Sequence, residues 1–195
     1  MVLLIAVFVG LLAGLIRARV KKREYRYSDL RHPWLVLAAF IPQLFAFFIP
    51  ATSQKVSDPL AVIILVSSQA LLLIFSFLNI KKTSFWPIIT GFLANFLVIL
   101  LNGGLMPISP ATITKMLPEG AANIYQVGER LGTGKDIVLN DIDTRLAFLS
   151  DRIVVRNFLN ASVAFSAGDI LIAIGVLWLL WSMGGPKEKV LLEKI

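Results

Sequence analysis

The stretch "LAVIILVSSQALLLIFSFL" (residues 60–78) is nineteen residues long and carries no charged side chain. A helix of roughly 20 apolar residues is long enough to cross a bilayer. Only 16% of the 195 residues are charged, against about 25% in soluble domains. The sequence therefore predicts an all-α integral membrane protein, a single membrane domain over residues 1–195 with five transmembrane helices. The other four apolar stretches are residues 1–16, 34–50, 86–101 and 168–183.

The positive charges indicate how the chain is threaded. With the N-terminus outside, the cytoplasmic parts are the loops 17–33 and 79–85 and the tail 184–195. These parts hold 12 of the 19 Lys and Arg residues, and cytoplasmic loops are enriched in Lys and Arg. We therefore expect a multi-pass protein with its N-terminus outside and its C-terminus inside. Residues 102–167 then form an extracytoplasmic cap between the fourth and fifth helices.

Composition excludes several kinds of site. The chain has no cysteine, and His32 is its single histidine, so disulfides, thiolate metal sites and multi-histidine metal sites are excluded. We expect no metal and no cofactor. The net charge of +7 comes largely from basic residues beside the apolar runs, so the expected partners are membrane lipids and not nucleic acid. The basic segment 16–31 is expected to set the topology, to contact anionic lipid headgroups, or both.

Three amide side chains, Gln43, Gln69 and Asn95, fall near the middle of the second, third and fourth stretches. An amide that faces lipid is costly, so all three are expected to face protein or water. They serve either as hydrogen bonds between helices or as the lining of a polar pocket. No charged residue occupies the middle of a stretch, which counts against an ion-coupled transporter or pump.

The predicted cap divides into two parts. Prolines at positions 107, 110 and 118 are expected to break its first third into turns and short helices. Residues 140–159 are predicted to form a helix, because Leu146, Leu149, Ile153 and, less regularly, Phe158 give an apolar stripe at helical spacing. Asp141 or Asp143 is the expected cap of that helix.

The motif "NGGLMPISP" (102–110) follows the fourth stretch. Asn and Gly tolerate left-handed backbone angles, so one interpretation is a helix end and a tight turn. The other is a loop that folds back into the mouth of the bundle. In that case Asn102, Gly103 and Gly104, together with Arg152, are candidate ligand-binding residues.

The segment "GERLGTGKD" (128–136) faintly resembles a phosphate-binding loop, but the pattern fails. The pattern requires glycine at position 129 and serine or threonine at position 136, where this chain has Glu129 and Asp136.

The last apolar stretch is preceded by "SAGD" (166–169), which is close to a capping box. On this interpretation Ser166 accepts a hydrogen bond from the amide of residue 169, and Asp169 stabilises the helix N-terminus. The alternative pairs Asp169 with Asp151 of "LSDRI". Two carboxylates that share one proton at the membrane surface would act as base and acid, although Arg152 favours the ionised form of Asp151.

The arrangement of "NGGLMP", "TRLAFLSDRI" and "FSAGDILIAIG" resembles a family of small bacterial membrane proteins, the domain-of-unknown-function family 5317. The resemblance covers nearly the whole chain. It implies a bacterial origin, hence the bacterial cytoplasmic (inner) membrane, and a polytopic membrane fold. It implies no activity.

A second resemblance covers about 35 residues. "SDRI" followed by "FSAGD" is similar to the lipoprotein signal peptidases, which have D-R at the outer end of one span and F-N-x-A-D at the start of the last. This similarity implies that Asp151 and Asp169 form a catalytic pair. Four positions depart from that pattern: Ser166 replaces Asn, Gly168 replaces Ala, and Phe148 and Thr144 stand where Asn and Gly precede D-R.

The function expected first is not enzymatic. It is an accessory or scaffold subunit, or a binding module for a lipid or apolar ligand at the outer membrane face, with a membrane-protein partner or a second copy of the chain as its companion. The alternative is an intramembrane aspartyl hydrolase similar to signal peptidase II that uses Asp151 and Asp169. A small channel or transporter is the third interpretation.

Overall fold

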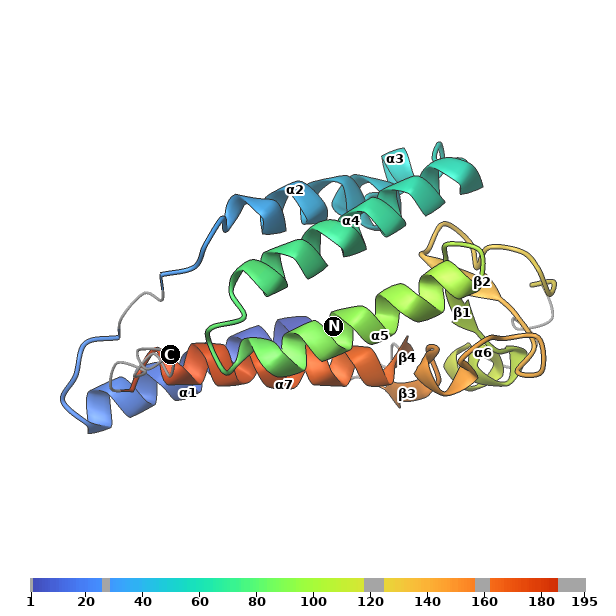
Figure 1. The fold of residues 1–195 in the computed structure, drawn as a ribbon. Helices are drawn as coiled ribbons and strands as arrows, with labels where there is room; N and C mark the ends of the chain where they lie inside the picture. The colour runs from blue at the N-terminus through green and yellow to red at the C-terminus, as the bar shows by residue number, and fades with distance from the viewer. Residues whose placement is uncertain (1, 26–28, 118–124, 157–161, 186–195) are drawn as a thin grey trace.

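The computed structural model describes residues 2–25, 29–117, 125–156 and 162–185. All five apolar stretches are helical, and their predicted positions are confirmed to within a few residues (Figure 1). The helices are α1 (Val2–Val20), α2 (Trp34–Gln43) with its continuation η1 (Leu44–Phe48), α4 (Asp58–Leu78), α5 (Phe85–Leu101) and α7 (Ala167–Ser182).

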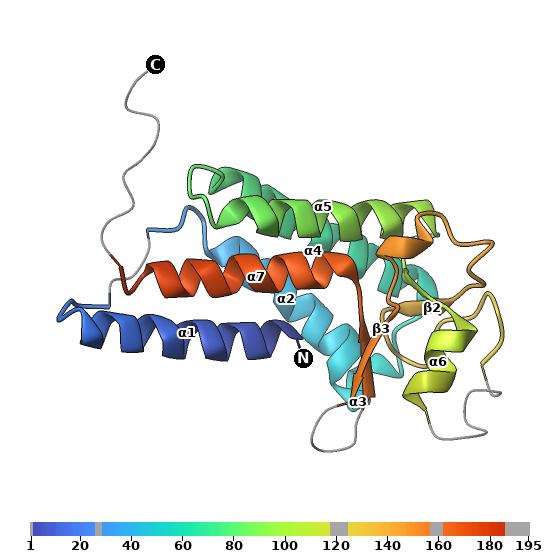
Figure 2. The same cartoon turned by 90° about the horizontal axis from the view of Figure 1, so that it is seen from below.

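Helices α1, α5 and α7 lie nearly parallel or antiparallel to one another, whereas α2 crosses them obliquely (Figure 2). Helix α7 lies between α1 and α5 and packs along both, as Figure 2 shows. Helix α4 packs on α5 and also on α2, so α2 and α4 form a second layer (Figure 1).

The second helix is irregular in its second half. Pro42 lies inside α2, where it lacks an amide donor for the helical ladder. The chain then continues as one turn of π-helix, η1, before the short helix α3 (Pro50–Ser53). The hydroxyl of Thr52 donates to the carbonyl oxygens of Phe45 and Ile49, at 2.5 and 3.1 Å, and ties this turn together.

The contact between α5 and α7 is close because glycines meet there. Gly91 of α5 faces Gly168 of α7, and a Cβ atom on either residue would collide with the backbone of the opposite helix. Small residues of this kind let two helix backbones approach closely. The approach brings Asn95 of α5 against the first turn of α7.

Residues 102–117, 125–156 and 162–166, called the end region below, gather at one end of the helices (Figures 1 and 2). Strand β1 (Met106–Ile108) pairs in parallel with β2 (Asp136–Val138), and β3 (Ile153–Arg156) pairs antiparallel with β4 (Ser162–Phe165). The short helices α6 (Pro110–Met116) and η3 (Ala147–Leu149) complete the region. The expectation of an all-α fold is therefore wrong here: the protein is mostly helical with two small sheets.

The predicted helix over residues 140–159 is also wrong. Residues 140–146 form turns, η3 is a single 3₁₀ turn, and β3 follows. Leu146 has a left-handed φ of +54°, which interrupts a helix, and the β-branched residues 153–155 favour a strand. Phe158 lies outside the described residues. Asp141 and Asp143 cap no helix, since Asp141 pairs with Arg152 and Asp143 accepts from Asn140.

The described parts of the two connectors that were predicted to be cytoplasmic lie at the end opposite the end region. The chain leaves α1 there, and the turn between α4 and α5 lies there too (Figure 1). Among the described residues, two helices are long and apolar enough to cross a membrane, α1 over Leu3–Val20 and α4. The other three apolar helices have 10–17 residues. These lengths are consistent with membrane association.

Candidate functional site

Helix α7 begins with the capping box that its sequence predicts. The Ser166 hydroxyl accepts a hydrogen bond from the Asp169 amide at 3.0 Å, and Asp169 Oδ2 accepts one from the Ser166 amide at 3.1 Å. Each side chain thus satisfies an amide that the first helical turn leaves without a partner. Asp169 therefore has a structural task at the start of this helix.

Asn95 joins this cap to the neighbouring helix. Its amide nitrogen donates to Asp169 Oδ1 at 2.8 Å, and its carbonyl oxygen accepts from the Ser166 hydroxyl at 2.8 Å. Asn95 and Ser166 are both buried. Asn95 thus faces protein, and both sides of its amide connect α5 to α7.

A second polar group lies in the end region, around the ammonium of Lys135. This ammonium lies 2.6 Å from Asp151 Oδ2 and 3.0 Å from Asp136 Oδ1. Asp151 is 1% exposed and its backbone is fixed, because its amide donates to the Pro107 carbonyl at 3.1 Å. Strands β1 and β2 thus hold the partners of this ion pair in register.

The two polar groups interact electrostatically. Burial raises the pKa of Asp151 from its ordinary value of 3.8 to about 7; Lys135 acts to lower this pKa, while Asp136 and Asp169 act to raise it. Burial acts to lower the pKa of Lys135, but Asp136, Asp151 and Asp169 together raise this pKa above its ordinary range. The Lys135 ammonium therefore interacts electrostatically with three carboxylates, those of Asp136, Asp151 and Asp169. Asp151 Oδ1 is buried and has no hydrogen-bond partner among the described residues.

The structure brings Asp151 and Asp169 near enough to influence each other, but it gives them different partners. Asp151 pairs with Lys135, and Asp169 bonds to Asn95 and to the start of its own helix. No hydrogen bond joins the two carboxylates within the described parts of the chain. The geometry is that of two anchored side chains, which does not favour a pair that shares one proton.

Of the predicted ligand-binding residues, Asn102 is fully engaged in the fold. Its side chain donates to the carbonyls of Val98 and Arg145, at 2.7 and 2.8 Å, and accepts from the Arg145 amide at 2.8 Å. Gly103 has a φ of +88° and open space beside its Cα, whereas Gly104 packs on Val62. These residues form the turn predicted after the fourth stretch.

Arg152 lies apart from this turn's hydrogen bonds and pairs with Asp141, at 3.1 Å, on the exposed surface. The expected effect of Arg152 on Asp151 is therefore replaced by that of Lys135. A ligand at Asn102, Gly103, Gly104 and Arg152 stays a prediction.

The other two amide side chains of the apolar helices are less tightly held than Asn95. Gln43 and Gln69 are both partly buried. The Gln69 side-chain oxygen is buried and has no hydrogen-bond partner among the described atoms. It is a buried acceptor on α4 whose hydrogen-bonding capacity is not used by the described residues.

Arg130 was missed by sequence reasoning and anchors the end region. Its side chain is 5% exposed and lies 3.5 Å from Asp58 at the start of α4. It also donates to the carbonyls of Val56, Thr133 and Gly134. Arg130, Lys135 and Asp136 all come from the segment that failed as a phosphate loop. The glycines and the closely spaced charged residues of segment 128–136 were the only sequence signal that this segment is structured.

The described residues contain no group of three or more His, Asp or Glu side chains placed to hold a metal ion.

A family model described as "Family of unknown function (DUF5317)" matches residues 28–181. This range begins just before α2 and ends within the last turn of α7. Neither the curated proteins nor the solved structures contain a match to this chain.

Proposed function

Since the chain belongs to this family of unknown function (DUF5317), we propose its role from its own structure. We propose a five-span protein of the bacterial inner membrane, with its N-terminus outside and its C-terminus inside. Its end region is an outward-facing binding module, and the protein acts as an accessory subunit for another membrane component.

One observation carries the membrane assignment: large apolar side chains are exposed on all five apolar helices. In water such a surface drives association, whereas hydrocarbon removes the penalty. The exposed side chains include Leu4, Phe8, Phe40, Phe48, Ile63, Phe77, Leu97 and Ile174.

The four tryptophans support the same membrane assignment. Trp34 begins α2, Trp86 is the second residue of α5, and Trp178 and Trp181 lie in the last turns of α7. All four are exposed and lie toward the end that carries the basic connectors. Tryptophan rings concentrate at membrane interfaces, and Lys and Arg concentrate on the cytoplasmic side.

Helices as short as α5 and α7 are compatible with this proposal because their flanks contain interfacial groups. Arg17 of α1 stacks on the Trp181 ring, 3.7 Å from its centroid, and donates to the Trp181 carbonyl at 3.3 Å. A cation and an aromatic ring at a helix end reach the membrane–water interface by snorkelling, and a helix shorter than the bilayer core can therefore still span it.

A binding role for the end region is supported by how firmly it is mounted. Arg130 ties it to the start of α4, Asn102 ties Arg145 to the end of α5, and the Lys135–Asp151 pair joins the segments that precede β2 and β3. On its surface Ile142 and Phe148 are exposed. These exposed apolar side chains, on a region tied to the helices at several points, offer a surface that a partner can contact. We do not favour the hydrolase, since Asp151 is committed to Lys135.

Site-specific photocrosslinking in living cells tests this role. A photoreactive residue replaces Phe148 or Ile142, and Glu129, an exposed polar position of the end region, is the matched control. The proposal predicts discrete adducts, to one protein or one lipid, from positions 142 and 148 and far less adduct from position 129. Equal, diffuse labelling from all three positions would contradict it.

A further inference from the structure

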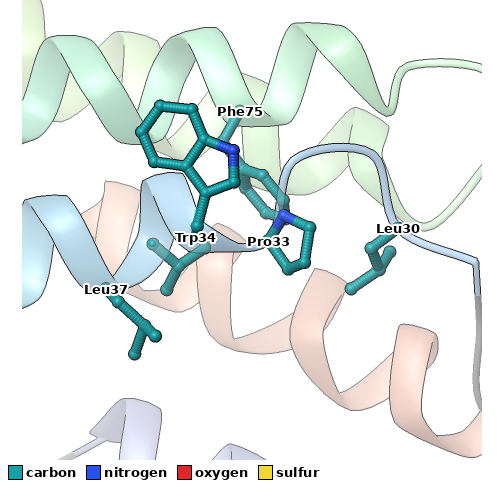
Figure 3. A pocket seen from close by; sticks show the side chains of 6 residues that line it. Leu30, Pro33, Trp34, Leu37 and Phe75 are labelled. Atoms are coloured by element: carbon teal, nitrogen blue, oxygen red, sulfur yellow. The ribbon is translucent and has the colours of Figure 1, made fainter.

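An apolar pocket lies at the end of the molecule opposite the end region. It has a volume of about 540 Å³ and lies between the start of α2 and the end of α4 (Figure 3). We call it the Trp34 pocket; its lining residues are Leu30, Pro33, Trp34, Val36, Leu37 and Phe75. The lining is almost entirely apolar, so the pocket suits a hydrocarbon chain better than a polar solute.

Hydrogen bonds fix one side of this pocket's rim. Asn79 at the end of α4 accepts from the Arg31 amide at 2.8 Å and donates to the Arg31 carbonyl at 3.0 Å. It also donates to the Phe75 carbonyl at 2.9 Å. The backbone between Leu30 and Pro33 is thus fixed to α4. A pocket with a fixed rim needs little reorganisation to accept a ligand.

Positive charge surrounds the rim. Arg31 lies between the lining residues Leu30 and Pro33 and is exposed. Lys81 and Lys82 follow Asn79 in the same turn, and the Lys82 amide donates to the Asn79 carbonyl at 3.0 Å. Neither Arg31 nor these lysines form an ion pair within the described parts of the chain. Within residues 29–34 and 79–85, Asp29 is the one acidic residue against Arg31, Lys81 and Lys82, so cations are in excess.

We propose that the Trp34 pocket binds an anionic phospholipid from the inner leaflet. The acyl chain packs on Trp34 and Phe75, and the phosphate is bound by Arg31 with the lysines of the 79–84 turn. A guanidinium donates two parallel hydrogen bonds to a phosphate, and each basic residue near the surface adds attraction to anionic lipid. This inference rests on the membrane orientation proposed above, which puts this end at the cytoplasmic face.

Tryptophan quenching by lipids with brominated acyl chains tests the proposal. One variant keeps Trp34 alone and the other keeps Trp86 alone, with phenylalanine at the remaining tryptophan positions. Trp34 and Trp86 are matched, because they are 59% and 60% exposed and lie at the same end, but Trp86 does not line the pocket. Each protein is reconstituted in phosphatidylcholine vesicles that contain a small, equal fraction of brominated phosphatidylglycerol or brominated phosphatidylcholine.

The expected result is that phosphatidylglycerol quenches Trp34 about fivefold more effectively than phosphatidylcholine does. Trp86 is expected to respond equally to both lipids. Arg31→Gln with Lys81→Gln removes the preference at Trp34, whereas Lys55→Gln at the opposite end retains it.

Equal quenching of Trp34 by the two lipids overturns the lipid site and leaves the membrane orientation intact. If neither tryptophan is quenched by either lipid, the membrane assignment itself fails. Native mass spectrometry of the wild-type chain provides a second measurement that does not depend on the tryptophan substitutions. There, loss of retained phosphatidylglycerol in the Arg31→Gln, Lys81→Gln variant supports the site, and unchanged retention overturns it.

Discussion

Asn79 and Asn102 make the same set of three hydrogen bonds at opposite ends of the molecule. Each residue follows the last residue of a helix, α4 or α5, and each donates to a carbonyl four residues earlier in its own helix. Each also exchanges a reciprocal pair of bonds with one backbone residue of a connector, Arg31 for Asn79 and Arg145 for Asn102. The same arrangement of three asparagine hydrogen bonds thus fixes each end of the bundle to a connector.

The first prediction concerns these two asparagines. Asn102→Ala removes the acceptor of the Arg145 amide, and Asn79→Ala removes the acceptor of the Arg31 amide. Each variant is expected to lose about 1–3 kcal/mol of stability. Hydrogen exchange followed by mass spectrometry will rise around residue 145 in the first variant and around residue 31 in the second. Each variant is the other's control, and a rise at both ends in either one would contradict separate clamps.

The second prediction concerns the ion pair of Lys135 and Asp151. Lys135→Met leaves the buried Asp151 carboxylate without its cation. Because 40% of the Lys135 side chain is exposed, the loss is expected to be about 1–3 kcal/mol, less than for a fully buried pair. Adding Asp151→Asn to this variant is expected to recover part of the loss, since no unpaired charge then remains.

Thermal unfolding in detergent measures this effect, with Lys55→Met at an exposed lysine as the control. A Lys135→Met protein as stable as the Lys55→Met protein would exclude a structural role for the pair.

The third prediction is a dependence of stability on pH. Burial raises the pKa of Asp151 to about 7 in the folded protein, while the unfolded chain retains a value near 3.8. Between these values the unfolded state ionises first, so this group's contribution to stability is full below pH 4 and falls as pH rises to 7. The raised pKa of Lys135 keeps the ammonium charged throughout this window.

The measurement is the difference in unfolding temperature between the wild type and Asp151→Asn from pH 4.5 to 8. The wild type is expected to lose stability relative to the variant as pH rises, and the difference levels off above pH 7. Curves that stay parallel would refute the raised pKa.

The fourth prediction concerns the contact of α5 and α7. Gly168→Ala places a methyl group against Asn95 and the α5 backbone. The collision is expected to destabilise the protein by about 1–3 kcal/mol, in spite of the better helix propensity of alanine. Leu93→Ala, at an exposed position of α5, is the control for thermal unfolding. The close contact is not supported if the two variants unfold at the same temperature.

The helices and the cap of α7 were predictable because their signals are local. An apolar run of helical length needs no knowledge of its neighbours. Ser166 and Asp169 are three residues apart and satisfy each other's backbone amides. The reciprocal bonds of this capping box are set by that spacing alone.

The end region was not predictable in the same way. The apolar spacing of residues 146–153 fits a helix, but Asn102 holds the chain at Arg145, and Leu146 turns left-handed. The partners of Arg130 and Lys135 come from separate parts of the chain, Asp58 and Asp151. Pairings of this kind depend on the assembled fold, so the sequence of residues 128–136 does not show which residues its charged side chains pair with.

The central claim, that the connector after α1 and the end region lie on opposite sides of a membrane, is tested most directly by cysteine labelling. The chain contains no cysteine, so single substitutions report without background. Ile142→Cys, at a residue that is 92% exposed, and Lys21→Cys are treated in intact cells with a membrane-impermeant maleimide. The account predicts that position 142 is labelled in intact cells and position 21 only after permeabilisation; labelling of both positions from the same side would contradict it.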